Sequence, residues 1–240
     1  MTQISGLSSV WDGWDFSYLL SILLGVIPSL ICITLHELSH GYVAYRLGDD
    51  TAKQAGRLTL NPLKHLDPVG LLMMLVFRVG WAKPVPVNSR NFKNPRMYRF
   101  KNPKRGMAIT ALAGPVSNVL ITLVFLLLYG ALYVPLRGSS VGGYFLEMIE
   151  LTAYMSLGLA VFNLIPLPPL DGSKVLFALM SDESYYKLMR YERYGGLVLM
   201  VLMMTGVLGK PVSTVVSAIY SNLIPVAQFA CDLVVKLFYK

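Results

Sequence analysis

The sequence predicts an all-α, polytopic membrane protein with about five transmembrane helices and one small re-entrant or β-hairpin element. Composition is the first reason: 55% of the 240 residues are hydrophobic and 14% are charged, whereas soluble domains carry about 25% charged residues. The second reason is several apolar runs of about 20 residues, the length that crosses a bilayer as a helix. We expect residues 1–240 to form a single membrane-embedded domain.

The apolar runs define the predicted helices and their ends. The first run begins without charged residues and stops at Gly48, and Gly209-Lys210-Pro211 separates the two arms of the last one. Glycine and proline at these places are typical helix breakers. Helices are therefore predicted over residues 16–47, 106–134 and 144–165, with a C-terminal helical hairpin over residues 195–236.

One apolar stretch, Val69–Phe77, is too short to span a bilayer and has basic residues on both sides. Crossing there would place a basic cluster on the outer side, so residues 66–90 are predicted to form a re-entrant or extended element. Within it, residues 81–88 alternate Pro and Val. Because proline lacks the N–H that a central strand needs, this segment is predicted to be an edge strand or an extended loop.

The basic charge is concentrated in one part of the chain. The net charge is +8, and 13 of the 21 Lys and Arg residues fall between Arg46 and Arg105. A basic block beside apolar helices is typical of a cytoplasmic, lipid-facing segment, and it argues against a nucleic-acid partner. The charges orient the helices with the N-terminus outside and the C-terminal end of the first helix in the cytoplasm.

The first helix ends in a metal-binding motif, His36-Glu37-Leu38-Ser39-His40. On a helix, residues i and i+4 lie one turn apart on the same face, so both imidazoles can reach one Zn²⁺. The intervening Glu37 then stands beside the metal as a general base. The chain has only three histidines, and polar groups at membrane depth are usually functional.

A catalytic zinc keeps three protein ligands and a water. Asp171 follows the helix at 144–165 on the cytoplasmic side, at the same depth as His40, and it closes a run with three prolines in four positions. It is the favoured third ligand, and His65 is an alternative that the sequence leaves open. The full set of candidates is His65, Asp67, Glu147, Glu150 and Asp171.

Three motifs in this order resemble the site-2 protease family of intramembrane metalloproteases, peptidase family M50: His36–His40, Gly114–Asn118 and Asn163–Gly172. The resemblance implies that His36, His40 and Asp171 hold one Zn²⁺ per chain and that Glu37 is the catalytic acid/base. It further implies that the helices at 16–47, 106–134 and 144–165 form a three-helix catalytic core.

The resemblance also suggests roles for residues around the metal. Asn163 would position the substrate or stabilise the oxyanion. Asn118 would support the core, and it is a second candidate for a direct role at the substrate or the oxyanion. The segment at 81–88 would match a membrane re-entrant β-hairpin of the family. An edge strand at Val85 and Val87 could then hold an unwound substrate segment by strand addition.

The expected function is hydrolysis of peptide bonds in transmembrane segments, within a bacterial plasma membrane and with the site towards the cytoplasm. The short connection at Arg137–Gly143 leaves no room for a PDZ domain, and no regulatory CBS domain is expected. A minimal form of this kind would select its transmembrane protein substrate through the core itself or a regulatory membrane partner. Two alternatives stay open: a metal or proton transporter, and a catalytically silent membrane scaffold. The sequence does not define the substrate or the oligomeric state.

Overall fold

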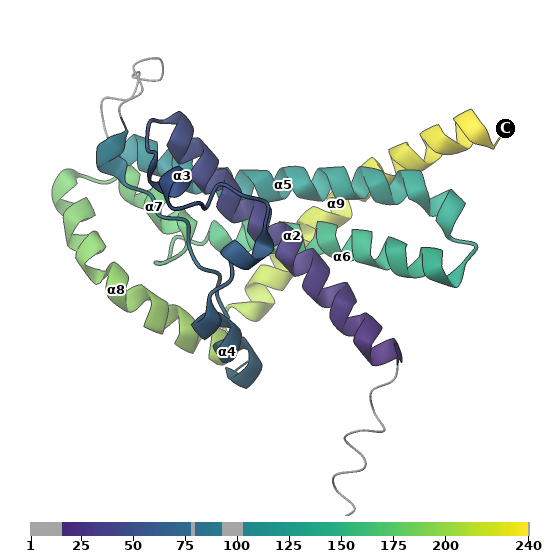
Figure 1. The fold of residues 1–240 in the computed structure, drawn as a ribbon, viewed down its shortest axis with the longest axis horizontal. Coiled ribbons are helices and arrows are strands. Elements are labelled where there is room, and N and C mark those ends of the chain that lie inside the picture. The colour runs from purple at the N-terminus through teal and green to yellow at the C-terminus, as the bar shows by residue number, and fades with distance from the viewer. Residues whose placement is uncertain (1–15, 78–79, 93–102, 240) are drawn as a thin grey trace, which may run out of the picture.

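The computed structural model describes residues 16–77, 80–92 and 103–239. It is helical, and the long helices α2, α5, α6 and α9 form its body (Figure 1). Helix α2 is Phe16–Arg46 and carries the metal-binding motif near its C-terminal end. A short helix α3, Thr51–Gln54, follows it directly.

Helices α5 and α6 form an antiparallel pair along the body. Helix α5 is Pro103–Leu136, α6 is Ser140–Asn163, and the two lie side by side (Figure 1). Only residues 137–139 join them, so an inserted domain has no place between these helices. The predicted ranges 106–134 and 144–165 agree with the observed helices to within four residues at each end.

Helix α9, Gly209–Phe238, packs across α5 and α6 rather than against the helix that precedes it in sequence. Small residues allow this close approach, because a Cβ on Gly130 would lie 1.9 Å from the carbonyl oxygen of Ala227. A buried cluster of Leu126, Ala153 and Ala227 marks the contact of the three helices.

Three helices among the described residues are long and apolar enough to cross a membrane: α5, α6 and α9. Helix α8 is Asp182–Met204, and only its part Tyr194–Met204 is apolar, which is shorter than the ~20 residues of a span. The region predicted as a hairpin, 195–236, therefore consists of the apolar last half of α8 followed by the long apolar helix α9. The count of five spans stays a prediction.

The predicted re-entrant element contains a short helix and an extended segment. Helix α4 is Pro68–Phe77, and the chain returns beside its own start, since the N–H of Lys83 donates to the carbonyl of His65 at 2.9 Å. Leu66 and Ala82 form an isolated antiparallel bridge. No strand is found in the parts of the chain that the structure describes, so the expected β-hairpin is not observed. The prolines at 84 and 86 remove the N–H groups that a ladder needs.

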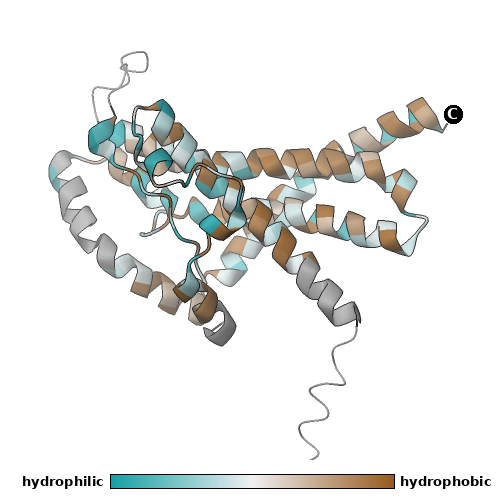
Figure 2. Cartoon of the chain, in the orientation of Figure 1, coloured by the Kyte–Doolittle hydropathy of each residue, from teal (hydrophilic) through white to brown (hydrophobic). Residues whose placement is uncertain are grey.

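Hydrophilic residues gather at one end of the molecule, where α3, α7 (Asp171–Ala178) and the start of α5 lie (Figure 2). The rest of α5 and the C-terminal part of α9 are mainly hydrophobic in the same view. Of the basic residues expected at this end, Arg96, Arg99 and Lys101 lie outside the described residues. Lys104 is buried on the first turn of α5, where its Nζ donates to the carbonyl of Met180 at 3.4 Å.

Candidate active site

His36 and His40 lie on one face of α2, and both side chains are buried. The Nδ1 of His40 lies 2.7 Å from the carbonyl oxygen of Thr110 on α5. A carbonyl only accepts, so Nδ1 must carry the ring proton. Neutral His40 therefore has its Nε2 lone pair free, and this atom lies 3.1 Å from Nε2 of His36.

Asp171 joins the two histidines from the other end of the sequence. It is the first residue of α7, and its Oδ2 lies 3.2 Å from Nε2 of His36 and 3.0 Å from Nε2 of His40. Gly172 allows the approach, because a Cβ there would lie 2.3 Å from the carbonyl oxygen of Leu164. With glycine at this position, α7 folds back against the end of α6 and carries Asp171 to the histidines.

The three converging atoms fit a zinc ion. Tetrahedral Zn²⁺ with bonds of about 2.0–2.1 Å separates its ligand atoms by about 3.3–3.4 Å, close to the 3.0–3.2 Å seen here. Asp171 Oδ2 is buried without a hydrogen-bond donor, and buried acceptors without a partner are costly. Two imidazole nitrogens and one carboxylate oxygen are a ligand set typical of catalytic zinc. Among the residues that the structure describes, His36, His40 and Asp171 are the group that could hold a metal.

Gly114 on α5 leaves the space that the imidazoles occupy. A Cβ at this position would lie 2.4 Å from Nε2 of His40 and 2.5 Å from Cε1 of His36. Any side chain larger than hydrogen would therefore push the rings away from their meeting point. This contact explains the glycine of the Gly114–Asn118 motif.

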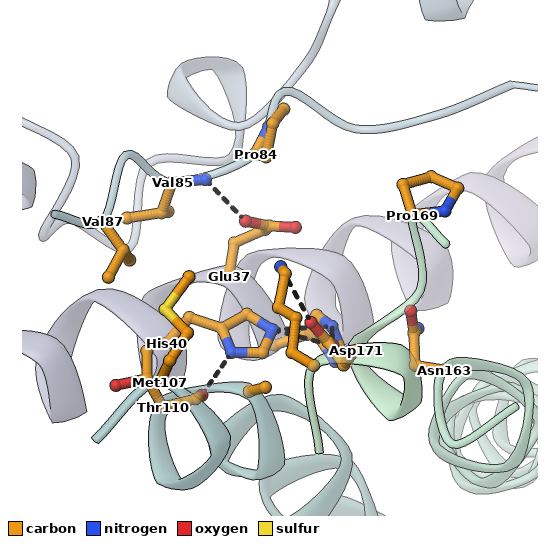
Figure 3. A pocket seen from close by; sticks show the side chains of 13 residues that line it. Glu37, His40, Pro84, Val85, Val87, Met107, Thr110, Asn163, Pro169 and Asp171 are labelled. Carbon is orange, nitrogen blue, oxygen red and sulfur yellow. Dashed lines mark hydrogen bonds and ion pairs between the residues drawn. The ribbon is translucent and has the colours of Figure 1, made fainter. Parts of the chain in front are cut away.

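Glu37 faces a cavity of about 310 Å³ beside the three candidate ligands. Figure 3 shows Glu37 reaching towards the extended segment, with His40 and Asp171 on its other side. The N–H of Val85 donates to Oε2 of Glu37 at 2.9 Å. The cavity lining contains the predicted residues Glu37, Val85, Val87 and Asn163 together with the three candidate ligands.

A buried carboxylate that the sequence analysis did not single out holds the extended segment over the cavity. Asp49, just after α2, is fully buried and accepts from the N–H of Asn88 at 2.6 Å and from Nδ2 of Asn91 at 2.9 Å. Burial alone would raise the pKa of Asp49, but hydrogen bonds from Thr51, Asn88 and Asn91 outweigh it and hold the pKa below its usual range. Arg57 adds a further bond to the carbonyl of Lys83 at 2.6 Å. A single Asp after a helix gives no sequence signal for such a role.

Other candidates from the sequence lie away from the cavity. His65 is fully buried, and its Nε2 bonds the carbonyl of Thr59 at 2.9 Å. Asp67 accepts from the N–H groups of Val69 and Gly70 at the start of α4. The structure therefore brings Asp171, and not His65 or Asp67, to the two histidines.

Three further candidates lie on the α5 and α6 helices outside the cavity. Asn118 is fully buried on α5, and its backbone carbonyl accepts from the hydroxyls of Thr122 and Ser156. Glu147 and Glu150 are exposed on α6. Asn118 thus lies at the contact of α5 with α6 and is not among the residues that line the cavity.

Four further residues line the cavity and carry no signal in the sequence. Met107, Thr110 and Ala111 come from α5, and Lys174 comes from α7. Met107, Thr110 and Ala111 lie before the Gly114–Asn118 motif and Lys174 lies after the Asn163–Gly172 motif, so none of them belongs to a motif. They reach the site because α5 packs on α2 and α7 packs on α5.

Fold and cavity together define a class of protein: an apolar helical bundle with a candidate His/His/Asp metal centre. The carboxylate of Glu37 lies beside that centre and is not one of its candidate ligands. Residues 132–209 match Peptidase family M50. The chain is 42% identical over 186 residues to YwhC of Bacillus subtilis, which covers 75% of this chain and 80% of that protein. It is 29% identical over 197 residues to Rip2 of Mycolicibacterium smegmatis, covering 81% and 71% of the two chains. It is 32% identical over 169 residues to MJ0611 of Methanocaldococcus jannaschii, covering 67% and 75%.

All three relatives are named as zinc metalloproteases. No solved structure matches the chain. The chain belongs to peptidase family M50, the site-2 protease family, and is an integral membrane zinc metalloprotease.

Proposed function

We propose that this protease cuts peptide bonds within transmembrane segments of other membrane proteins. The observation that carries the proposal is one cavity lined by His36, Glu37, His40 and Asp171, in a bundle whose helices α5, α6 and α9 are apolar enough to cross a bilayer. His40 lies six residues before the end of α2 at Arg46, and Thr110 lies seven residues into α5. The cavity is therefore within the depth that the apolar helices cover, near their hydrophilic end.

His36, His40 and Asp171 would hold the zinc ion, and Glu37 would move the protons. When bound, zinc acts as a Lewis acid on the scissile carbonyl and lowers the pKa of a water towards neutrality. Glu37 accepts the proton of the attacking water and returns it to the leaving amine. Its carboxylate is held ready by one backbone donor, Val85 N–H.

Asn163 ends α6 and lines the cavity, where it would position the substrate or donate to the oxyanion. One of its amide protons is already used, because Nδ2 donates to the carbonyl of Leu159 at 3.0 Å. The second proton is left for a substrate carbonyl.

A transmembrane substrate must unwind before cleavage, because its helical carbonyls are bonded to N–H groups four residues on. The extended segment at Val85 and Val87 would hold the unwound chain by strand addition. Pro84 and Pro86 supply no N–H, so these two valines are the donors that this stretch can offer. Val85 N–H is bonded to Glu37, whereas Val87 N–H has no acceptor in the described part of the chain.

The charge pattern supports an orientation with the cavity towards the cytoplasm, and the membrane we propose is the plasma membrane of a bacterial cell. The hydrophilic end in Figure 2 carries the basic start of α5, and basic residues favour the cytoplasmic side. Substrate choice would then depend on the core or on a regulatory membrane partner.

The position of the cut tests the proposal. Purified enzyme with zinc is placed in liposomes with a single-span membrane protein, and the new termini are determined by mass spectrometry. We expect a cut within the apolar segment of the substrate. Cuts confined to its water-exposed flanks would contradict cleavage inside the membrane.

Val87→Pro tests strand addition. It removes the free donor and leaves the bond from Val85 to Glu37 intact. One backbone hydrogen bond contributes about 0.5–1.5 kcal/mol, so KM should rise about 2- to 10-fold with little change in kcat. Val85→Pro is the comparison variant. It removes the N–H that donates to Glu37, so it should lower kcat. Unchanged KM in Val87→Pro would rule out strand addition at this residue.

A further inference from the structure

Lys174 occupies the first turns of α7, three residues after Asp171. Residues at i and i+3 share a helix face, and Lys174 Nζ lies 3.7 Å from Oδ1 of Asp171. The other oxygen, Oδ2, faces the two histidines. The Asp171 carboxylate thus lies between the two histidines and the Lys174 ammonium.

Lys174 lines the same cavity as Glu37 and is largely shielded from solvent. Its side chain is 29% exposed. Of the thirteen described residues that line the cavity, it alone is Lys or Arg, and the two carboxylates are Glu37 and Asp171. With Zn²⁺ bound, the formal charges of +2 and +1 against −2 leave +1, so the site is matched to a substrate that develops one negative charge.

The ammonium is not committed to Asp171. A separation of 3.7 Å is beyond the 2.7–3.2 Å of an N–H···O hydrogen bond, and an i, i+3 pair adds little to helix stability. Lysine carries three donors on a flexible stem. At least one of them is available to a group that enters the cavity.

We propose that Lys174 is a catalytic residue that donates a hydrogen bond to the oxyanion formed when water attacks the scissile carbonyl. This inference rests on the proposed peptide hydrolysis. As the carbonyl π bond opens, negative charge moves onto the oxygen, and the Lys174 ammonium stabilises it without giving up its proton. Groups aimed at charge that develops only in the transition state raise kcat rather than binding.

Lys174→Met tests the proposal, because methionine keeps the stem and removes the charge. One lost oxyanion donor costs about 10²- to 10³-fold in kcat, so kcat should fall about 100-fold while KM changes little. Lys174→Arg should recover a large part of kcat. Zinc affinity, measured by competition with a chelator, should stay within a few-fold of wild type in both variants. Each variant is assayed in liposomes on the single-span substrate used to map the cut.

Lys104→Met is the matched control, since it removes a buried lysine at the same end of the fold that does not line the cavity. It should keep the wild-type kcat, with thermal unfolding followed to register any loss of stability. Wild-type kcat in Lys174→Met would overturn the proposal, and so would a parallel loss of zinc, which would mean that Lys174 only positions Asp171. Cleavage at the wild-type rate by Glu37→Gln would contradict the proposed hydrolysis itself, an outcome that the Lys174 variants cannot produce.

Discussion

Replacing Glu37 by Gln is expected to lower kcat about 10³-fold while zinc stays bound at one ion per chain. Glutamine keeps the size of the side chain and cannot accept the proton of the attacking water, and general acid–base catalysis contributes about 10²- to 10⁴-fold. Glu37 is not among the three atoms that converge on one point, so its charge is not needed to hold the metal. Cleavage of a single-span substrate and zinc content by elemental analysis measure the two effects.

The hydrogen bond from Val85 supplies an internal check on this result. Glutamine can still accept from the Val85 N–H through its amide oxygen, so the extended segment should keep its place. Loss of zinc in Glu37→Gln would show that Glu37 helps to hold the metal, and cleavage within a few-fold of wild type would show that Glu37 is not the base of the reaction.

Gly114→Ala is expected to abolish zinc binding in a folded chain. The new Cβ would lie 2.4 Å from Nε2 of His40 and 2.5 Å from Cε1 of His36. His40 is tied by its Nδ1 to the carbonyl of Thr110, so the ring moves only by breaking that bond. Zinc affinity should fall by more than the about 10- to 100-fold that changes around metal ligands cause, and activity should fall with it.

Gly158→Ala is the control for this change. Gly158 lies on α6, and a Cβ there would meet nothing within 4 Å. Alanine is favoured over glycine in a helix by about 1 kcal/mol, so both variants gain equally from propensity. Wild-type zinc affinity in Gly114→Ala would contradict the placement of the histidines against α5.

The long helices were predictable because lipid imposes a simple demand on them. Each needs about 20 apolar residues, and glycine or proline ends the run, so residues 106–134 and 144–165 could be recognised from composition. The metal-binding motif was predictable for a related reason. Its two histidines are local in sequence, and their spacing matches one helical turn.

Asp171 was predictable only from depth and resemblance, because it lies 131 residues after His40. The sequence left His65 open, and the structure separates the two: His65 bonds Thr59, and Asp171 meets the histidines. The reason lies at Gly172, whose missing Cβ lets the first turn of α7 approach the carbonyl of Leu164 just after α6. A contact of that kind has no periodic signature.

The contacts of the extended segment could be predicted only in part from local sequence patterns. Prolines at 84 and 86 predicted an irregular edge, and in the structure Val85 and Val87 line the cavity. The bond from Val85 to Glu37 joins residues 48 positions apart, and the bond from Asn88 to Asp49 joins residues 39 positions apart. Tertiary packing alone creates such contacts, and the same holds for Lys174 at the cavity.

The identity of the third zinc ligand tests the central claim most directly. Zinc content and affinity are measured for Asp171→Ala and His65→Ala purified in parallel, both being buried polar side chains. We expect Asp171→Ala to lose the ion and His65→Ala to retain one zinc per chain, since only Asp171 meets the two histidines. Retention of zinc by Asp171→Ala together with its loss from His65→Ala would contradict the metal centre described above.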